Sequence, residues 1–162
     1  MGLFDKLKKK LMENESIHVP VNGKVISLKD IEDGVFSEGI LGKGVGIIPK
    51  EEIIYAPFDG QVTVIADTKH AIGLKSKNGV ELLIHVGIET VEMKGEGFEQ
   101  QVQVGDSIKI GQQIMTFSLK EIQKAGYPST IAVIVTNSDD YSEVKVLGEG
   151  DMEKQEELIQ VL

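Results

Sequence analysis

Closely spaced turn signals limit this chain to a fold built from short β-strands. Asn22-Gly23, Asp59-Gly60 and Asn78-Gly79 each stand between apolar runs, and such pairs form tight turns because Gly accepts a positive φ without steric cost. STIAVIVTN (Ser129–Asn137) contains a strongly β-branched run of the kind that favours a sheet and ends in a polar loop. With 18 glycines and only 5% aromatic residues, the composition suits such a fold better than a helical bundle. We expect an all-β protein, an antiparallel β-sandwich or barrel.

Two segments of the chain resemble each other. IHVPVNGKVISL (Ile17–Leu28) and IYAPFDGQVTVI (Ile54–Ile65) both place a Pro and an apolar residue before an Asn-Gly or Asp-Gly turn. We expect this duplicated, hairpin-like motif to form two β units around a pseudo-symmetric core. Helix is expected only in short segments. One lies within Phe117–Pro128, and one or two acidic helical turns follow Asp151.

The N-terminus differs from the rest of the chain. Residues 1–10 carry four lysines against one aspartate, a charge of +3, so the remaining 152 residues carry −12. Apolar side chains recur beside the lysines at helical spacing, at Leu3, Phe4, Leu7 and Leu11. We expect residues 1–15 to be a flexible amphipathic tail and residues 16–162 to be a single domain. A frayed tail and a weak contact of residues 1–11 with an anionic membrane both fit the pattern.

Charge and composition exclude several classes of protein. A net charge of −9 makes nucleic acid an unfavourable partner, because phosphate backbones require a basic surface. The absence of cysteine excludes disulfides, a thiol nucleophile and a thiolate metal site. There is no apolar run of the roughly 20 residues that span a bilayer and no secretory signal. These features agree with a cytoplasmic protein.

One histidine stands inside an apolar strand, in the stretch GVELLIHVGIETV (Gly79–Val91). If the strands on either side of Asn78-Gly79 pair around a two-residue loop, His85 lies opposite Ile72. His70 is then a diagonal neighbour at roughly 7–8 Å. Thr68 can hydrogen-bond to His70, and Gly87 leaves space beside the ring of His85. An unconnected pair of histidines is the alternative, since buried polar groups usually just find a local partner.

Two converging imidazoles can act as nucleophile, proton shuttle or metal ligands. Zinc takes three protein ligands at catalytic sites, and a carboxylate such as Asp139 could be the third. The sequence has neither His-x-His nor His-Glu-x-x-His, which makes a zinc hydrolase a minor alternative. It also has no Gly-x-Ser-x-Gly elbow and no Walker loop. We therefore expect no metal and no cofactor.

Gly79–Glu99, GVELLIHVGIETVEMKGEGFE, resembles the active-site signature of the glucose-type IIA proteins of the bacterial sugar phosphotransferase system. The similarity extends to MGLFDKLK at the N-terminus, to residues 20–49 and to residues 56–74. It implies a phosphotransferase component, a histidine phosphocarrier. His85 would accept a phosphoryl group from phospho-HPr on Nε2 and pass it to a cysteine of the IIB domain of a sugar transporter.

The resemblance also implies roles for neighbouring residues. The carbonyl of Gly87 would hold the other ring nitrogen of His85, and His70, oriented by Thr68, would donate a hydrogen bond to the phosphoryl group. An apolar rim would dock both partners, and an acidic fringe would attract a basic HPr surface. The rim consists of Val35, Phe36, Ile40, Leu41 and Leu83, and the fringe of Asp33, Glu89 and Asp139. Ordinary core positions are the alternative for the five apolar residues.

Three positions depart from the family pattern. Glu89 stands where Asp is usual, Leu83 where Phe is frequent, and Ala66 where some members carry a larger residue. These changes affect partner affinity rather than the phosphoryl chemistry. A regulatory docking module of the same fold, without its own sugar transporter, is the main alternative function. A biotinyl or lipoyl carrier would need a modifiable Met-Lys-Met tip, which the sequence lacks.

Overall fold

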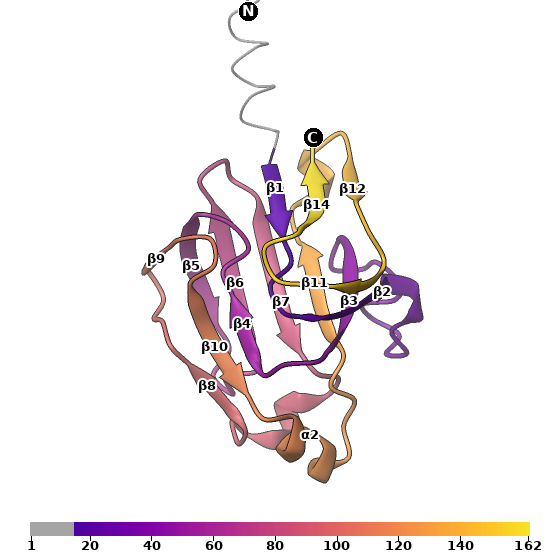
Figure 1. Ribbon diagram of the computed structural model, residues 1–162, viewed down its shortest axis with the longest axis vertical. Helices are drawn as coiled ribbons and strands as arrows, with labels where there is room; N and C mark the ends of the chain where they lie inside the picture. The colour runs from indigo at the N-terminus through magenta and orange to yellow at the C-terminus, as the bar shows by residue number, and fades with distance from the viewer. Residues whose placement is uncertain (1–14) are drawn as a thin grey trace, which may run out of the picture.

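Three antiparallel sheets enclose one main hydrophobic core (Figure 1). The computed structural model describes residues 15–162, so the predicted membrane-contacting tail lies outside the described residues. The all-β expectation is confirmed. Glu15, the last residue assigned to that tail, pairs with Val161.

The largest sheet has eight strands in the order β13-β2-β3-β11-β7-β6-β5-β9. Their bounds are β13 (Gly150–Met152), β2 (Gly23–Ser27), β3 (Lys43–Pro49), β11 (Ile131–Val135), β7 (Glu81–Val86), β6 (Ala71–Ser76), β5 (Gly60–Ile65) and β9 (Ser107–Ile108). Two three-stranded sheets complete the fold. One is β1 (Glu15–His18), β14 (Glu157–Val161) and β12 (Val144–Val146), and the other is β4 (Ile53–Tyr55), β10 (Gln113–Phe117) and β8 (Phe98–Gln100).

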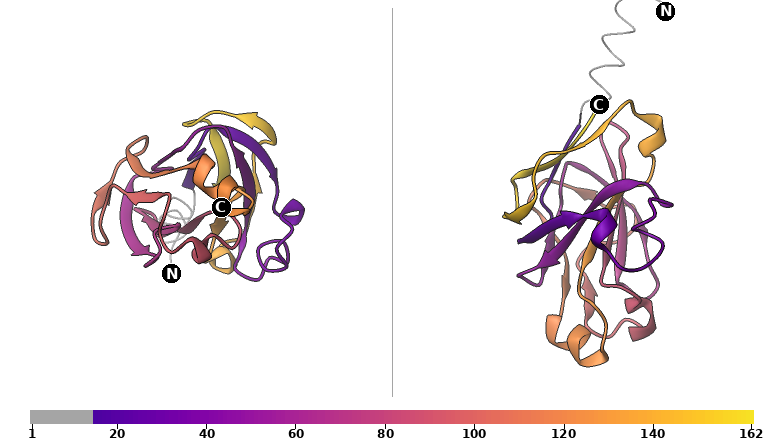
Figure 2. Two further views of the ribbon diagram at one scale, coloured as in Figure 1. Left: turned by 90° about the horizontal axis from the view of Figure 1, so that it is seen from below. Right: turned by 90° about the vertical axis from the view of Figure 1, so that its right-hand side faces the viewer.

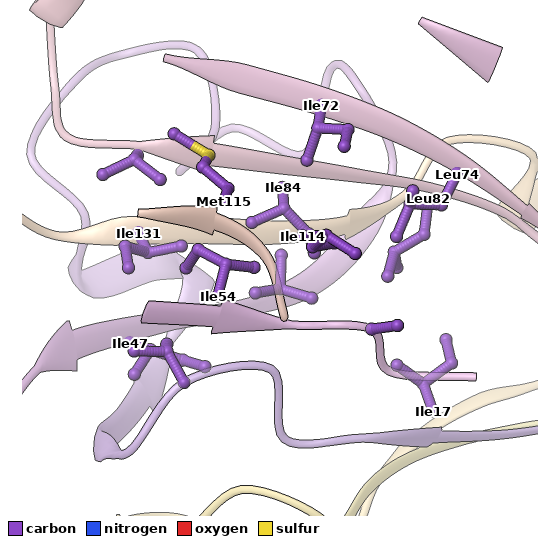
Figure 3. Close-up of a cluster of buried hydrophobic side chains, with 14 of the residues drawn as sticks. Ile17, Ile47, Ile54, Ile72, Leu74, Leu82, Ile84, Ile114, Met115 and Ile131 are labelled. Carbon is purple, nitrogen blue, oxygen red and sulfur yellow. The ribbon is translucent and has the colours of Figure 1, made fainter. Parts of the chain in front are cut away.

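Strand β7 shows how the sequence pattern divides between the two faces of the large sheet. Leu82, Ile84 and Val86 are buried in the main core, whereas the alternate residues Leu83 and His85 face the other side and are half-buried. Figure 3 shows Leu82 and Ile84 packing with side chains from β4, β6, β10 and β11. The apolar run around His85 therefore anchors the strand and fixes the position of the imidazole.

The duplicated motif is real, but its turns do not form hairpins, so this part of the prediction is wrong. Strand β1 pairs with β14 while β2 pairs with β3 and β13. In the same way, β4 pairs with β10 while β5 pairs with β6 and β9. Each turn is a corner that carries the chain from one sheet to another. Two backbone hydrogen bonds link the two copies. His18 N–H donates to the Pro57 carbonyl (2.9 Å), and Tyr55 N–H donates to the Pro20 carbonyl (2.7 Å).

The hairpin between β6 and β7 has a register one residue away from the prediction. His85 lies opposite Ala71 rather than Ile72. The loop contains three residues, Lys77 to Gly79, because Ser76 and Val80 still bond to each other. Gly79 has φ +94° and ends the turn, as expected for a three-residue loop with glycine in the left-handed position.

The C-terminal segment after Asp151 is extended, not helical. Leu158, Ile159 and Val161 of β14 are fully buried between β1 and β12. The other predicted helix is confirmed as α2 (Leu119–Ala125), capped by Ser118 and ended at Gly126. Helix α2 lies at the end of the molecule opposite to β12 and the C-terminus (Figures 1 and 2). Within residues 15–162, no helix is long and apolar enough to cross a membrane.

Candidate functional site

The imidazole of His85 is held in one orientation by its own strand end. Its Nδ1 atom lies 2.8 Å from the carbonyl oxygen of Gly87. A carbonyl oxygen only accepts hydrogen bonds, so Nδ1 carries the hydrogen in this contact and Nε2 keeps its lone pair. This is the contact that the family resemblance implies for Gly87. The arrangement leaves Nε2 as the nucleophilic atom of the ring.

The loop that presents the Gly87 carbonyl is itself fixed by three hydrogen bonds. Gly87 N–H donates to the Thr130 carbonyl and Ile88 N–H to the Pro128 carbonyl, both at 3.0 Å. The buried hydroxyl of Thr90, at the start of η2 (Thr90–Met93), donates to the Val86 carbonyl at 2.5 Å. Sequence reasoning missed Thr90. The only available signal was its place in the signature stretch Gly79–Glu99, five residues after His85.

His70 meets His85 at the end of the β6–β7 hairpin. The two ring centroids are 4.6 Å apart and the rings are nearly perpendicular, at 81°. The hydroxyl of Thr68 is 2.7 Å from Nδ1 of His70, which is the contact that the expected orienting role of Thr68 requires. The predicted meeting of the histidines is therefore present, although the register that led to it was off by one. His70 lies just before β6, where its carbonyl accepts a hydrogen bond from Val86 N–H.

Both imidazoles favour the neutral form. Burial, and after it the nearby His70, lower the pKa of His85 to about 4, against the opposing effects of the Gly87 carbonyl and the Asp33 carboxylate. Burial also lowers the pKa of His70, and hydrogen bonding to Thr68 partly offsets this effect. At neutral pH the site therefore holds two uncharged rings, one of which offers a free nitrogen lone pair.

An apolar rim borders the pair. The ring of Phe36 lies 4.9 Å from the His85 ring, centroid to centroid, and is buried on the outer face of the large sheet with Ile31, Ala132 and Ile134. Leu83 is half-buried and packs against this small cluster. The other three predicted rim residues are exposed, Val35 at 44%, Ile40 at 69% and Leu41 at 40%. Only Phe36 is a core position, so the alternative of ordinary core does not hold for these three.

The three acidic residues of the predicted fringe occupy different settings. The Asp33 carboxylate accepts backbone hydrogen bonds from Val35, Phe36 and Ser37. Burial raises the pKa of Asp33, but these bonds outweigh it and the net shift is downward. Glu89 is exposed two residues after Gly87. Asp139 lies in η3 (Ser138–Asp140), which follows the C-terminal end of β11. His85 pairs with Ala132, near the other end of that strand. It therefore stands apart from the histidines.

Comparisons with known proteins agree on one family. Residues 15–141 match the family model described as phosphoenolpyruvate-dependent sugar phosphotransferase system, EIIA 1. The chain is 40% identical over 144 residues to the glucose-specific EIIA component of Staphylococcus epidermidis, covering 89% of this chain and 86% of that protein. It is 43% identical over 145 residues to the β-glucoside-specific EIIBCA component of Bacillus subtilis, covering 90% of this chain but only 24% of that protein.

A solved structure has the same fold. The chain superposes on the glucose permease IIA from Mycoplasma capricolum with a TM-score of 0.80 and 30% sequence identity. The superposition covers 91% of this chain and 95% of that one. The histidine pair thus lies within a fold and a family model that cover most of the described residues.

Proposed function

Because the chain belongs to the EIIA 1 family of the phosphoenolpyruvate-dependent sugar phosphotransferase system, we propose that it carries a phosphoryl group on His85. The donor is phospho-HPr and the acceptor is the IIB domain of a sugar transporter. The observation that supports this most directly is the contact between Nδ1 of His85 and the Gly87 carbonyl, which leaves Nε2 free beside the ring of His70.

Nε2 attacks the phosphorus of the phosphorylated donor. The bond from phosphorus to the donor breaks as the Nε2–P bond forms, and no proton has to leave His85 because its neutral ring already has a lone pair there. The hydrogen on Nδ1 stays on that nitrogen and continues to be donated to the Gly87 carbonyl, which stabilises the positive ring that phosphorylation creates. In onward transfer, the Nε2–P bond breaks and a bond to the sulfur of the IIB cysteine forms. Positioning and charge stabilisation are sufficient for this chemistry.

His70 assists by hydrogen bonding to the phosphoryl group. When the Thr68 hydroxyl donates to Nδ1 of His70, the hydrogen of that ring is on Nε2 and available to a phosphoryl oxygen. A neutral donor stabilises the transferring group without holding it as strongly as a fixed cation would. This balance suits a carrier that must release what it accepts.

The exposed apolar rim suits a protein that binds two partners in turn. Val35, Ile40 and Leu41 offer exposed apolar surface in the segment that carries Phe36, the residue whose ring contacts His85, and Asp33 and Glu89 add negative charge that would steer a basic HPr surface. We place Asp139 at the periphery of this surface. The name of the Bacillus subtilis relative combines B, C and A components in one protein, which supports a IIB domain as the acceptor.

Two further parts of the proposal concern location. The relay would operate in the cytoplasm, and cell fractionation tests this. The segment that precedes β1 would form a tail whose residues 1–11 contact anionic membrane weakly, a proposal supported by their charge and apolar spacing.

The test of the relay is direct. The protein is incubated with phosphoenolpyruvate, enzyme I and HPr, and mass spectrometry should find one added, acid-labile phosphoryl group. His85→Ala should abolish the label, whereas His18→Gln, a change in the third histidine, should retain it. His70→Gln should still be labelled but should transfer the group onward slowly. Absence of label on the wild type, or its survival in His85→Ala, would refute the proposal.

A further inference from the structure

The turn that carries His70 has an unfavourable backbone conformation. Lys69 has φ +61° and is one of four non-glycine residues with a positive φ in residues 15–162. L-amino acids with long side chains rarely adopt this conformation, and it persists only where surrounding contacts enforce it. Within the turn, Lys69 N–H donates to the Ala66 carbonyl at 2.8 Å. The carbonyl of Lys69 has its hydrogen-bond partner outside the turn.

That partner is the side chain of Gln100 at the end of β8. Its Nε2 donates to the Lys69 carbonyl at 3.0 Å, across 31 residues of sequence. The other amide atom, Oε1, is buried and has no hydrogen-bond partner among the described residues. Rotating the amide would place two oxygens against each other, so the Lys69 carbonyl determines the orientation of the side chain. Gln100 thus makes a hydrogen bond to the Lys69 carbonyl while its own Oε1 stays without a donor.

Strand β8 contacts His70 itself as well. Phe98, two residues before Gln100 on the same strand, places its ring 6.3 Å from the His70 ring in an edge-to-face arrangement of 67°. Val86 N–H of β7 also donates to the His70 carbonyl, at 2.8 Å. The Thr68–His70 turn is thus held between β7 and β8, and Gln100 supplies the polar contact on the β8 side.

We propose that Gln100 is a positioning residue for His70 in phosphoryl transfer. By bonding to the Lys69 carbonyl it maintains the left-handed turn, which directs the His70 ring at His85 and at the phosphoryl group carried there. The inference rests on the proposed relay for its kinetic consequence. The placement of the His70 ring can be tested independently of that relay.

The experiment compares Gln100→Leu and Gln100→Glu with Gln101→Leu, a change in the adjacent exposed glutamine. Gln100→Leu removes the unsatisfied acceptor but also leaves the Lys69 carbonyl without its partner, and because these two effects oppose each other the thermal midpoint should change little. Onward transfer from phosphorylated protein should nevertheless fall roughly tenfold through lost positioning, while acceptance from phospho-HPr changes little. Gln100→Glu should be at least as impaired, since a carboxylate would face a carbonyl. Gln101→Leu should behave as wild type.

Two readouts separate positioning from a merely structural role. The ¹⁵N spectrum of the His70 ring should change in both Gln100 variants, and that of His85 much less. Gln100→Leu combined with His70→Gln should transfer no more slowly than His70→Gln alone, because the first change acts through the second residue. Three results would overturn the inference. They are a wild-type rate of onward transfer in Gln100→Leu, an unchanged spectrum of the His70 ring, and additive losses of transfer rate in the double variant. If the wild-type protein accepts no phosphoryl group, the proposed relay is refuted. The spectrum of the His70 ring then still tests whether Gln100 positions that ring.

Discussion

The protonation of His85 is the residue-scale property on which nucleophilic attack depends. Burial lowers its pKa to about 4 from an ordinary value of 6.5. Between these pH values the unfolded chain binds a proton that the folded chain does not, so the free energy of unfolding falls as pH decreases from 6.5 towards 4. Above pH 6.5 this penalty is absent. A ¹⁵N NMR titration of the His85 ring should have its midpoint near pH 4, and a midpoint near 6.5 would contradict the assignment.

The cause of this shift can be tested with neighbouring side chains. Phe36→Ala removes the ring that lies 4.9 Å from His85 and admits water, so the midpoint of the His85 titration should move upward. Val35→Ala changes an exposed neighbour and should leave the midpoint in place. Equal midpoints in the two variants would mean that burial by Phe36 is not what keeps the ring neutral.

At the scale of elements, the turn from β7 to η2 is more tightly constrained than the end of α2. Gly87 and Gly126 have similar φ, +81° and +87°. A Cβ at Gly87 would clash with the side chain of Thr90, whereas a Cβ at Gly126 would meet nothing within 4 Å. Gly126→Ala should therefore cost about 1 kcal/mol of stability for the left-handed backbone alone. Gly87→Ala should cost about 1–3 kcal/mol more for overpacking.

Denaturant unfolding of the two glycine variants measures this difference. Gly87→Ala should also slow phosphorylation, because the Gly87 carbonyl orients His85, whereas Gly126→Ala should not. If the two variants lose the same stability, the Thr90 packing does not constrain the turn.

Local signals in the sequence predicted elements well where neighbouring residues determine them. Ser118 and Gly126 mark the ends of α2, and the alternation along β7 places His85 on the outer face. The β6–β7 register was wrong because Asn78-Gly79 fits both a two-residue and a three-residue loop. Only the strand pairing distinguishes them. Strand β14 was missed because its partners, β1 and β12, are remote in sequence or carry no distinct signal.

The candidate site divides in the same way. His85, His70, Thr68 and Gly87 lie within 20 residues of one another, so a hairpin and a short signature were enough to bring them together. Thr90 and Gln100 act through side-chain bonds to backbone carbonyls, and such bonds depend on tertiary placement rather than on residue type. Asp139 was grouped with the site by resemblance, although it follows β11, which leads away from Ala132.

At the scale of the whole molecule, charge is divided between the N-terminal segment and the rest of the chain. Residues 1–10 carry +3 and the other 152 residues carry −12. An anionic membrane would attract the first and repel the second, so any contact should be weak and confined to the N-terminus. Binding to vesicles of phosphatidylglycerol and phosphatidylcholine should weaken as salt increases, since screening shortens the range of the attraction. Vesicles of phosphatidylcholine alone should not bind the protein.

Deleting residues 1–11 separates this contact from the relay. The deletion removes all four of the N-terminal lysines and the spaced apolar side chains, but it leaves β1, which begins at Glu15, intact. Vesicle sedimentation should therefore be lost, while labelling of His85 by phospho-HPr proceeds at the wild-type rate. A matched variant that replaces Lys8 and Lys9 with Glu should lose most of the binding, because apolar burial by so short a segment is insufficient without the charge. Undiminished sedimentation of the deletion would place the membrane contact elsewhere on the protein.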